Sequence, residues 1–271
     1  MRAPAVSGRF YPGSKPELER TVRELLAQVP GAHPAAARGA VAPHAGYVYS
    51  GFTAACVFAR LAIPPLVVVL APNHTGACHA PGGVSLWERG AFRTPLGDVA
   101  VDERFAAALL AASPLVGIDH EAHAAEHAIE VELPFLQLLR PDVRIVPLVL
   151  AGDAWAGCRE LGLALAGLVT RGPEAVLLLA SSDLNHYEPA RVSEPKDREA
   201  LAALEGLDGE ELLARCRRRR ISMCGRGPAA CVAAAARALG ATRGTVVDYR
   251  HSGWVTGEED AVVGYGGVII A

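Results

Sequence analysis

The fold is decided by the stretch LVVVLAPNHTG at residues 66–76, in which a continuous apolar run ends in small and polar residues. A second stretch of the same kind, AVLLLASSDLNHY, occupies residues 175–187. Strands that are apolar throughout are typical of a sheet buried on both faces, and helices cover such a sheet on its two sides. The sequence therefore predicts an α/β fold with a mixed or parallel central sheet flanked by helices.

Helical and strand periodicities alternate along the rest of the chain. Helices are predicted at residues 14–28, 51–61, 102–112, 124–139, 155–170, 195–219 and 228–239. Strands are predicted at residues 38–42, 66–71, 84–88, 144–150, 175–180, 245–249 and 261–270. Neither a low-complexity linker nor a fixed repeat interrupts this order, so we expect one domain over residues 1–271.

Composition and charge exclude several classes of protein. The chain has 271 residues, is 51% hydrophobic and carries a net charge of only −3, which argues against a disordered protein and against a nucleic-acid binder. The longest apolar run, residues 62–72, is too short to span a membrane, and the start has no apolar core of a signal peptide. We therefore expect a cytoplasmic protein with no membrane partner, whose six cysteines are mostly reduced.

Three predicted strands run into histidine or aspartate where they end. His44 follows one, His74 the second, and Asp183 and His186 the third. Ligands of open α/β sheets bind in the crevice at the carboxyl ends of the strands, so parallel neighbours would bring these side chains together. Imidazole suits zinc, copper, iron and nickel, and the pattern therefore predicts a metal site. The alternative is that each histidine is an ordinary loop residue with its own hydrogen bonds.

A cysteine lies in the segment MCGRGP at residues 223–228, just before a predicted helix. Pro228 fits the first turn of that helix, which puts Cys224 close to the helix N-terminus. The helix dipole and nearby Arg226 would both favour the thiolate. The segment therefore predicts a metal ligand or a nucleophile at Cys224, with a buried inert cysteine as the alternative.

The motifs of the chain, taken in order, resemble those of the Memo family, called AmmeMemoRadiSam system protein B in bacteria and archaea. They are SGRFYPGSKPELER (7–20), VAPHAGYVYSG (41–51), LAPNHTG (70–76), EHAIEVELPFLQ (126–137), SSDLNHY (181–187) and CGRGP (224–228). This family is similar in fold to the class III extradiol dioxygenases, which use non-haem iron. The resemblance extends over essentially the whole chain and implies that fold here.

The resemblance also implies roles for individual residues. Its metal ligands fall on His44, His74 and Cys224. Its pocket residues, for which acid–base or orienting roles are expected, fall on His127, Asp183 and His186. Two positions depart from the pattern, because Thr75 and Glu132 stand where some members carry histidine; these changes concern the outer pocket rather than the ligands.

The expected cofactor is a metal ion, with iron or copper favoured and zinc possible. A thiolate beside two imidazoles differs from the two histidines and one carboxylate of the ring-cleaving dioxygenases, so the fold does not bring their activity with it. One hypothesis is a redox-active, dioxygenase-like oxidoreductase acting on a small-molecule or peptide substrate. The other is a non-catalytic module that binds metal or peptide. The family name further implies AMMECR-type and radical SAM proteins as partners.

A different metal motif overlaps the EHAIE segment. His123, Glu126 and His127 match the HxxEH signature of inverzincin zinc peptidases, in which both histidines lie on one helix face. That mechanism needs a downstream glutamate as third ligand, for which Glu199 and Glu205 are available. The peptidase hypothesis therefore requires a continuous helix through His123 and His127.

Overall fold

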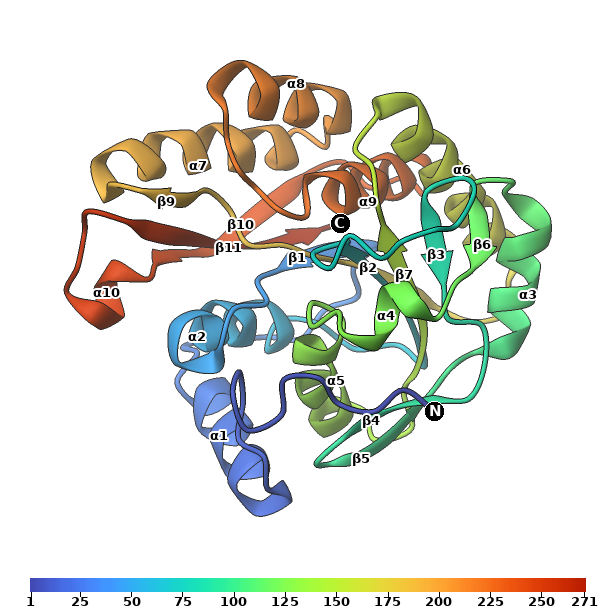
Figure 1. Ribbon diagram of the computed structural model, residues 1–271, viewed down its shortest axis with the longest axis horizontal. Helices are drawn as coiled ribbons and strands as arrows, with labels where there is room; N and C mark the ends of the chain where they lie inside the picture. Colours follow the sequence, from blue (N-terminus) through green and yellow to red (C-terminus); the bar gives the residue numbers. More distant parts are fainter.

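The central sheet of the computed structural model, which describes residues 1–271, has nine strands (Figure 1). Eight of them run in the order β10 (Gly244–His251), β11 (Val262–Ile270), β1 (Gly39–Ala42), β8 (Val176–Ser181), β2 (Leu66–Pro72), β7 (Arg144–Leu150), β3 (Val84–Leu86) and β6 (Val116–Ile118). The ninth, β9 (His186–Glu188), pairs with β11. One sheet with one helical layer on each side confirms the predicted single α/β domain.

Four neighbouring strands at the centre of the sheet are parallel. β1 pairs with β8, β8 with β2, and β2 with β7, all in parallel register. Every residue of β1, β2 and β8 is buried, as their continuous apolar sequences predict. The carboxyl ends of these strands therefore meet at one edge of the sheet. The outer strands make the sheet mixed, because β11 is antiparallel to β1 and β3 is antiparallel to β7.

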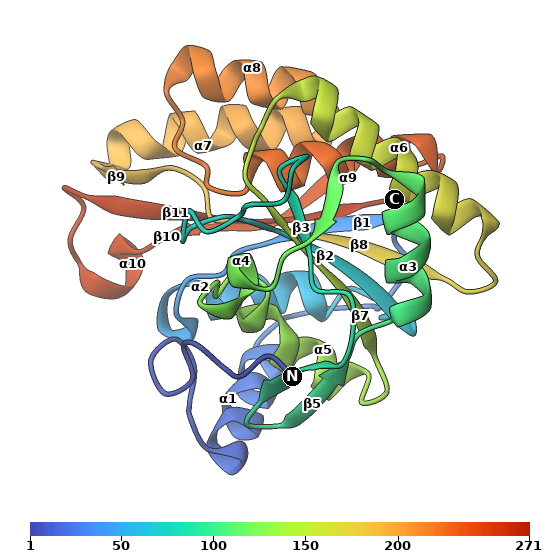
Figure 2. The same cartoon turned by 45° about the vertical axis from the view of Figure 1, so that its right-hand side comes forward.

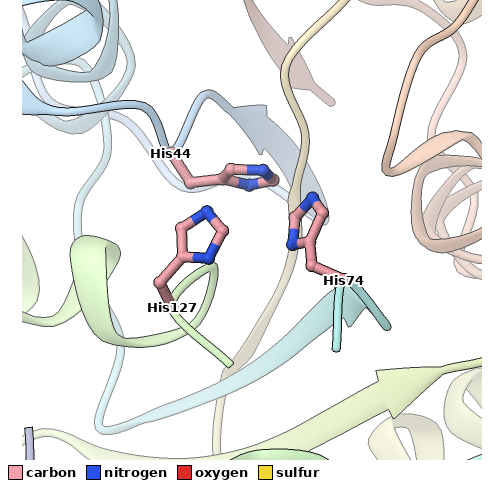
Figure 3. A group of neighbouring side chains, drawn as sticks. All are labelled: His44, His74 and His127. Carbon is pink, nitrogen blue, oxygen red and sulfur yellow. The ribbon is translucent and has the colours of Figure 1, made fainter. Parts of the chain in front are cut away.

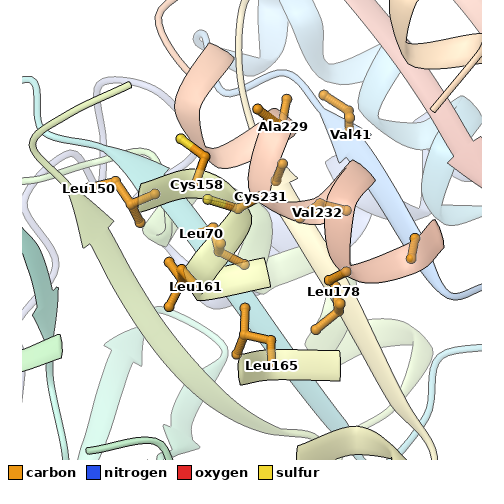
Figure 4. Close-up of a cluster of buried hydrophobic side chains, with 14 of the residues drawn as sticks. Val41, Leu70, Leu150, Cys158, Leu161, Leu165, Leu178, Ala229, Cys231 and Val232 are labelled. Atoms are coloured by element: carbon orange, nitrogen blue, oxygen red, sulfur yellow. The ribbon is translucent and has the colours of Figure 1, made fainter. Parts of the chain in front are cut away.

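Successive residues of the central strands enter two different hydrophobic cores. In β2, Val68 and Leu70 belong to one core, whereas Val67 and Val69 belong to the other. This alternation is the two-residue period of a strand that is covered on both faces. The first core lies under α6 and α9, and Figure 4 shows their aliphatic and cysteine side chains packed against the sheet.

The helices divide between the two faces of the sheet (Figure 2). One layer contains α3 (Glu103–Ala112), α6 (Trp155–Arg171), α7 (Ala190–Glu205), α8 (Gly209–Arg219) and α9 (Arg226–Ala238). The other contains α1 (Lys15–Ala27), α2 (Tyr47–Phe58) and α5 (Leu133–Leu139). No helix is both long enough and apolar enough to cross a membrane.

Two predicted helices are broken in the structure. The helix expected at residues 195–219 is α7 followed by α8, because Leu207 adopts a left-handed conformation and Asp208 accepts a hydrogen bond from Glu211 N at the start of α8. The helix expected at 124–139 is divided into α4 (Glu121–Ala124), a 3₁₀ turn η1 (Glu130–Glu132) and α5.

Several short elements were not predicted. They are the hairpin β4 (Ala91–Thr94) and β5 (Gly97–Ala100), the edge strands β6 and β9, and α10 (Gly253–Thr256). Each is only three or four residues long, which is too short for a periodicity to be recognised. In addition, α2 begins at Tyr47 rather than at residue 51, directly after Gly46.

Candidate metal site

The carboxyl ends of β1, β8 and β2 bring the predicted histidines together. β1 ends at Ala42 and β2 at Pro72, so His44 and His74 both follow directly at the same edge of the sheet. The centroids of their rings are 5.1 Å apart, with the ring planes nearly perpendicular. Asp183, which follows β8, accepts a hydrogen bond of 2.9 Å from the backbone N–H of His44. The predicted convergence of His44, His74 and Asp183 at one edge of the sheet is confirmed.

A third histidine, His127, completes a compact cluster with these two (Figure 3). One ring nitrogen from each of the three residues lies within 4.8 Å of the others. His127 stacks on His74 with ring centroids 4.7 Å apart and meets the edge of His44 at 5.3 Å. His44 is buried, whereas the side chain of His74 is 31% exposed. The cluster therefore has the geometry of a three-imidazole metal site that is open on one side.

Burial keeps two of these imidazoles neutral. It lowers the pKa of His44 to about 3, and the neighbouring His74 lowers it further. Burial also lowers the pKa of His127 to about 4, with His44 as the next cause. Metal ligands have to be deprotonated, so both rings are in the form that binds metal at neutral pH.

His74 differs because a carboxylate supports it. Glu126 accepts hydrogen bonds from His74 N at 2.7 Å and from His74 Nδ1 at 2.9 Å. Burial opposes a charge on His74, but the hydrogen bond and the charge of Glu126 outweigh it and raise the pKa of His74. Burial likewise favours the neutral form of Glu126, yet the bonds from His74 lower its pKa to about 2. An ionised Glu126 holds the proton of His74 on Nδ1, which leaves Nε2 free for a metal.

The N-terminal segment binds the residues on both sides of His127. The buried guanidinium of Arg2 donates to the carbonyl oxygens of His123 and Glu126 and pairs with the carboxylate of Glu130. Glu130 also accepts from Ala5 N at 2.7 Å, Val6 N at 3.0 Å and Tyr11 OH at 2.5 Å. Within the non-helical residues 125–129, the carbonyl oxygen of Glu126 is thus bound to Arg2 and its carboxylate to His74 instead of to a continuing helix.

Cys224 lies beside the histidine cluster. Its Sγ is 3.3 Å from His44 Nε2, although it is not part of the group whose atoms all lie within 4.8 Å of one another. The Cys224 segment packs closely on the end of β8, because a Cβ at Gly225 would lie 2.4 Å from Ser181 O. Asn185 also binds the Cys224 segment, because its Oδ1 accepts a hydrogen bond of 3.0 Å from the backbone N–H of Ser222. The structure thus places all three predicted metal ligands together.

The expected lowering of the Cys224 pKa is wrong. Burial raises the pKa of this thiol to about 12, and the charge of Asp183 raises it further. The helix α9 begins at Arg226, but the guanidinium of Arg226 pairs with Asp153 at 2.5 Å, so its charge is compensated. Desolvation therefore exceeds the helix dipole, and without a metal the thiol is neutral.

A cavity of about 730 Å³ opens from the cluster to the surface. The residues that line it include the three histidines, Cys224, Asp183 and His186. Its outer wall is largely aromatic and aliphatic: Phe10, Val48, Tyr49, Tyr187, Val263 and Tyr265. Tyr187 is 77% exposed and has a left-handed backbone, with φ of 61°. A cavity of this volume accommodates an organic substrate or a peptide side chain.

The two departures from the family pattern lie in different places. Thr75 is exposed next to His74 but is not among the residues that line the cavity. Glu132 is fully buried and contacts Ser181 at 2.7 Å, so its expected place in the outer pocket is wrong. Glu132 therefore lies behind the histidine cluster, next to the serine that contacts His44.

The HxxEH interpretation is also wrong. The helix α4 ends at Ala124, so His123 and His127 do not share a helix face. His123 is buried between the rings of Trp87 and Phe92, each with its centroid 6.1 Å away, and it is absent from the histidine cluster. Glu126, the expected base, is bound to His74.

Exchange of His123 for alanine should leave the number of zinc ions bound per chain unchanged, because its ring does not reach the cluster. Some stability should be lost, since the exchange leaves a cavity in a packed region. Metal analysis after dialysis against zinc measures the first effect. Loss of zinc from His123→Ala together with its retention in His74→Ala would show that the wrong histidines have been assigned.

Another buried carboxyl group, that of Asp197, supports the SSDLNHY segment. It accepts from Asn185 N at 2.8 Å and from Tyr249 OH at 2.8 Å. Burial raises the pKa of Asp197 to about 7. A raised pKa means that the folded protein holds this proton more tightly, so the stabilisation is complete below about pH 4 and is lost as the pH rises through 7.

We therefore expect wild-type protein to lose a few kcal/mol of unfolding free energy between pH 4 and pH 8 relative to Asp197→Asn, whose side chain does not ionise. Urea unfolding at a series of pH values measures the difference. Asp142→Asn is the control, because Asp142 is 75% exposed and should show no such dependence. Parallel pH profiles for wild type and Asp197→Asn would refute the assignment.

The sequence interpretation missed several residues that build the site. His127 was assigned to the pocket rather than to the metal, Glu126 was considered only as the base of the HxxEH motif, and Ser181 and Arg2 were given no role. A carboxylate that accepts from a histidine is typical of a supported metal ligand, but Glu126 supports His74, 52 positions away, so the EHAIE motif alone does not show it. Nothing in the sequence marks Arg2, whose partners lie more than 120 residues away.

The fold and the site together define a class of protein: an α/β protein with a histidine cluster suited to metal at the carboxyl ends of parallel strands. A family model described as Memo-like protein matches residues 2–269. The chain belongs to this Memo-like family.

Known proteins agree with this assignment over the full length. A MEMO1 family protein of Methanosarcina barkeri is 40% identical over 271 residues, which is 100% of both chains. A MEMO1 family protein of Aquifex aeolicus is 38% identical over 270 residues, covering 99% of this chain and 98% of its own. Among solved structures, an uncharacterized protein of Escherichia coli K12 is similar in fold, with a TM-score of 0.57, 15% identity, and coverage of 86% of this chain and 99% of that chain.

Proposed function

We propose that this protein binds one transition-metal ion through His44, His74 and His127 and uses it for redox chemistry on an organic substrate in the adjoining cavity. The observation that carries the proposal is the mutual approach of three imidazole nitrogens within 4.8 Å. Ligands of one metal ion each lie about 2 Å from it, so nitrogens this close need only small side-chain movements to share an ion.

The donor set fits a metal on chemical grounds. His44 and His127 are neutral because burial lowers the pKa of each, and His74 directs Nε2 to the cluster because Glu126 holds Nδ1. Three imidazoles with space on one side match a catalytic rather than a structural site, since structural sites are closed by four protein ligands. The cavity of about 730 Å³ supplies that space.

Iron and copper are the metals that we favour, with zinc as a third that the same ligands accept. A bound metal of this kind would supply an electron-transfer centre and a Lewis acid at the cavity floor. The residues of the chain then have separate tasks. His186, which lines the cavity, would move a proton to or from the substrate. Asp183 orients the His44 loop by accepting a hydrogen bond from the backbone N–H of His44.

A second donor set, His44, His74 and Cys224, is the one that the family resemblance implies. It is supported by the contact of 3.3 Å between Cys224 Sγ and His44 Nε2. Binding through sulfur would require the thiol to lose its proton to the solvent as the metal enters. Proton release on metal binding, measured in two buffers of different ionisation enthalpy, separates this set from the one with three imidazoles.

Metal analysis of anaerobically purified protein, followed by a turnover assay, tests the proposed function. We expect one metal ion per chain and consumption of an oxidant in proportion to product when aromatic and peptide compounds are supplied. Stoichiometric uptake without product would instead indicate the non-catalytic module that binds metal or peptide. Association with AMMECR-type and radical SAM proteins remains a prediction from the family resemblance.

A further inference from the structure

Ser181 lies behind His44 and makes three short contacts at a single hydroxyl oxygen. His44 Nδ1 lies 2.8 Å from Ser181 Oγ, the carbonyl oxygen of Ala128 lies 2.8 Å from it, and Glu132 Oε1 lies 2.7 Å from it. The exposed fraction is 1% for His44 and 0% for Ser181 and Glu132. Because these groups are closed off from solvent, the hydrogen of each hydrogen bond has to come from the protein itself.

The hydrogens available to this group can be counted. A serine hydroxyl donates one hydrogen and accepts two hydrogen bonds. The carbonyl of Ala128 can only accept, so it takes the hydrogen of Ser181. The two remaining contacts are then made to lone pairs of Ser181, and both His44 Nδ1 and Glu132 have to donate.

An ionised Glu132 does not satisfy the same contacts. It would take the hydrogen of Ser181, and the carbonyl oxygen of Ala128 would then face an oxygen lone pair at 2.8 Å with no hydrogen between them. An ionised Glu132 would also be a charge without a cationic partner in the interior, which costs several kcal/mol.

We infer that Glu132 is a neutral carboxylic acid that donates to Ser181, and that through Ser181 it holds His44 in the Nδ1–H form with Nε2 free. Glu132 is thus a positioning residue. Two further facts agree with this assignment. Burial raises the pKa of Glu132 well above its usual value, and Asp183 raises it further. The second oxygen, Oε2, has no hydrogen-bond partner, which costs less for an acid than for a carboxylate.

The two metal-facing histidines therefore have different supports. His74 donates to the ionised Glu126, which increases the basicity of its free nitrogen. His44 donates to a neutral hydroxyl that is itself held by a neutral acid. His74 is then the stronger donor and His44 the weaker one. This consequence rests on the proposed metal function, whereas the proton positions at Glu132 and His44 do not.

The test begins with metal-free wild-type protein at neutral pH. Carbon-13 NMR of the Glu132 carboxyl should give the chemical shift of a protonated acid, and nitrogen-15 NMR should show His44 protonated on Nδ1. An ionised Glu132, or a His44 protonated on Nε2, would overturn the inference. Both measurements use the unaltered chain, so they do not depend on whether a variant folds.

Two substitutions at Glu132 then separate proton donation from charge and shape. The amide of Glu132→Gln can still donate to Ser181, so the His44 tautomer and the zinc affinity should be unchanged. Glu132→Leu cannot donate, so His44 should become a mixture of tautomers and zinc affinity should fall about 10- to 100-fold. Glu17→Gln, a change in the exposed first turn of α1, controls for the loss of a carboxyl group elsewhere.

The outcomes distinguish this inference from the proposed function. If Glu132→Gln loses zinc as strongly as Glu132→Leu, a charge on Glu132 supports the site and the inference is wrong. If wild-type protein binds no zinc at all, the proposed metal function fails, while the tautomer of His44 and the protonation of Glu132 still decide the inference by themselves.

Discussion

Exchange of His74 for alanine is expected to lower the affinity for zinc by more than about 100-fold, because loss of a ligand should exceed the 10- to 100-fold cost of losing a residue that only supports one. The ring of His74 is one corner of the cluster, with its centroid 5.1 Å from that of His44 and 4.7 Å from that of His127. Its removal also leaves Glu126 without its histidine partner. Competition with a chromophoric chelator measures the affinity.

His33→Ala is the matched control for this exchange, because His33 is exposed and is not part of the cluster. It should bind zinc as wild type does. Glu126→Gln should have an intermediate effect of about 10- to 100-fold, since the ligand stays and only its support changes. Equal zinc affinities of wild type and His74→Ala would rule out a metal site at this edge of the sheet.

Arg2→Ala is expected to have the largest effect on stability, about 3 to 5 kcal/mol, because it leaves a buried charge unpaired. Arg2 is 2% exposed, and its partner Glu130 is fully buried. The same exchange removes the bonds to the carbonyls of His123 and Glu126, which hold the metal-site segment. Guanidinium unfolding measures the loss, and zinc affinity should fall as well because His127 is no longer held.

The control for Arg2→Ala is Arg20→Ala, which breaks an exposed pair with Glu24 whose atoms are 4.0 Å apart. Exposed pairs contribute about 0 to 1 kcal/mol, so this variant should be close to wild type. If Arg2→Ala costs no more than Arg20→Ala, the N-terminal segment does not support the metal site. Truncation of the segment would then also leave zinc affinity unaltered.

The sequence alone predicts the position of those site residues that directly follow a central strand. β1, β2 and β8 are apolar throughout, and such strands are parallel and central, so the residues that follow them have to converge. His44, His74 and Asp183 could therefore be placed together before any coordinates were known. The order of the motifs also indicated the family that the comparisons confirm.

The remaining parts depend on contacts between distant segments. His127 lies in an irregular stretch that helical periodicity predicts as helix, and the carbonyl of the preceding residue, Glu126, is bound to Arg2, 124 positions earlier in the chain. The pKa of Cys224 depends on how deeply the thiol is buried and on the pairing of Arg226 with Asp153, neither of which a local motif reveals. The burial of Glu132 also depends on a distant segment, because its carboxyl group contacts Ser181 at the end of β8.

The measurement that tests the metal site most directly is X-ray absorption spectroscopy of protein loaded with one equivalent of zinc. The account predicts a first shell of nitrogen and oxygen at about 2.0 Å, with outer-shell scattering from three imidazoles and no sulfur. His127→Ala should reduce the imidazoles to two. A sulfur neighbour at about 2.3 Å together with only two imidazoles would contradict the three-histidine assignment and transfer the third position to Cys224.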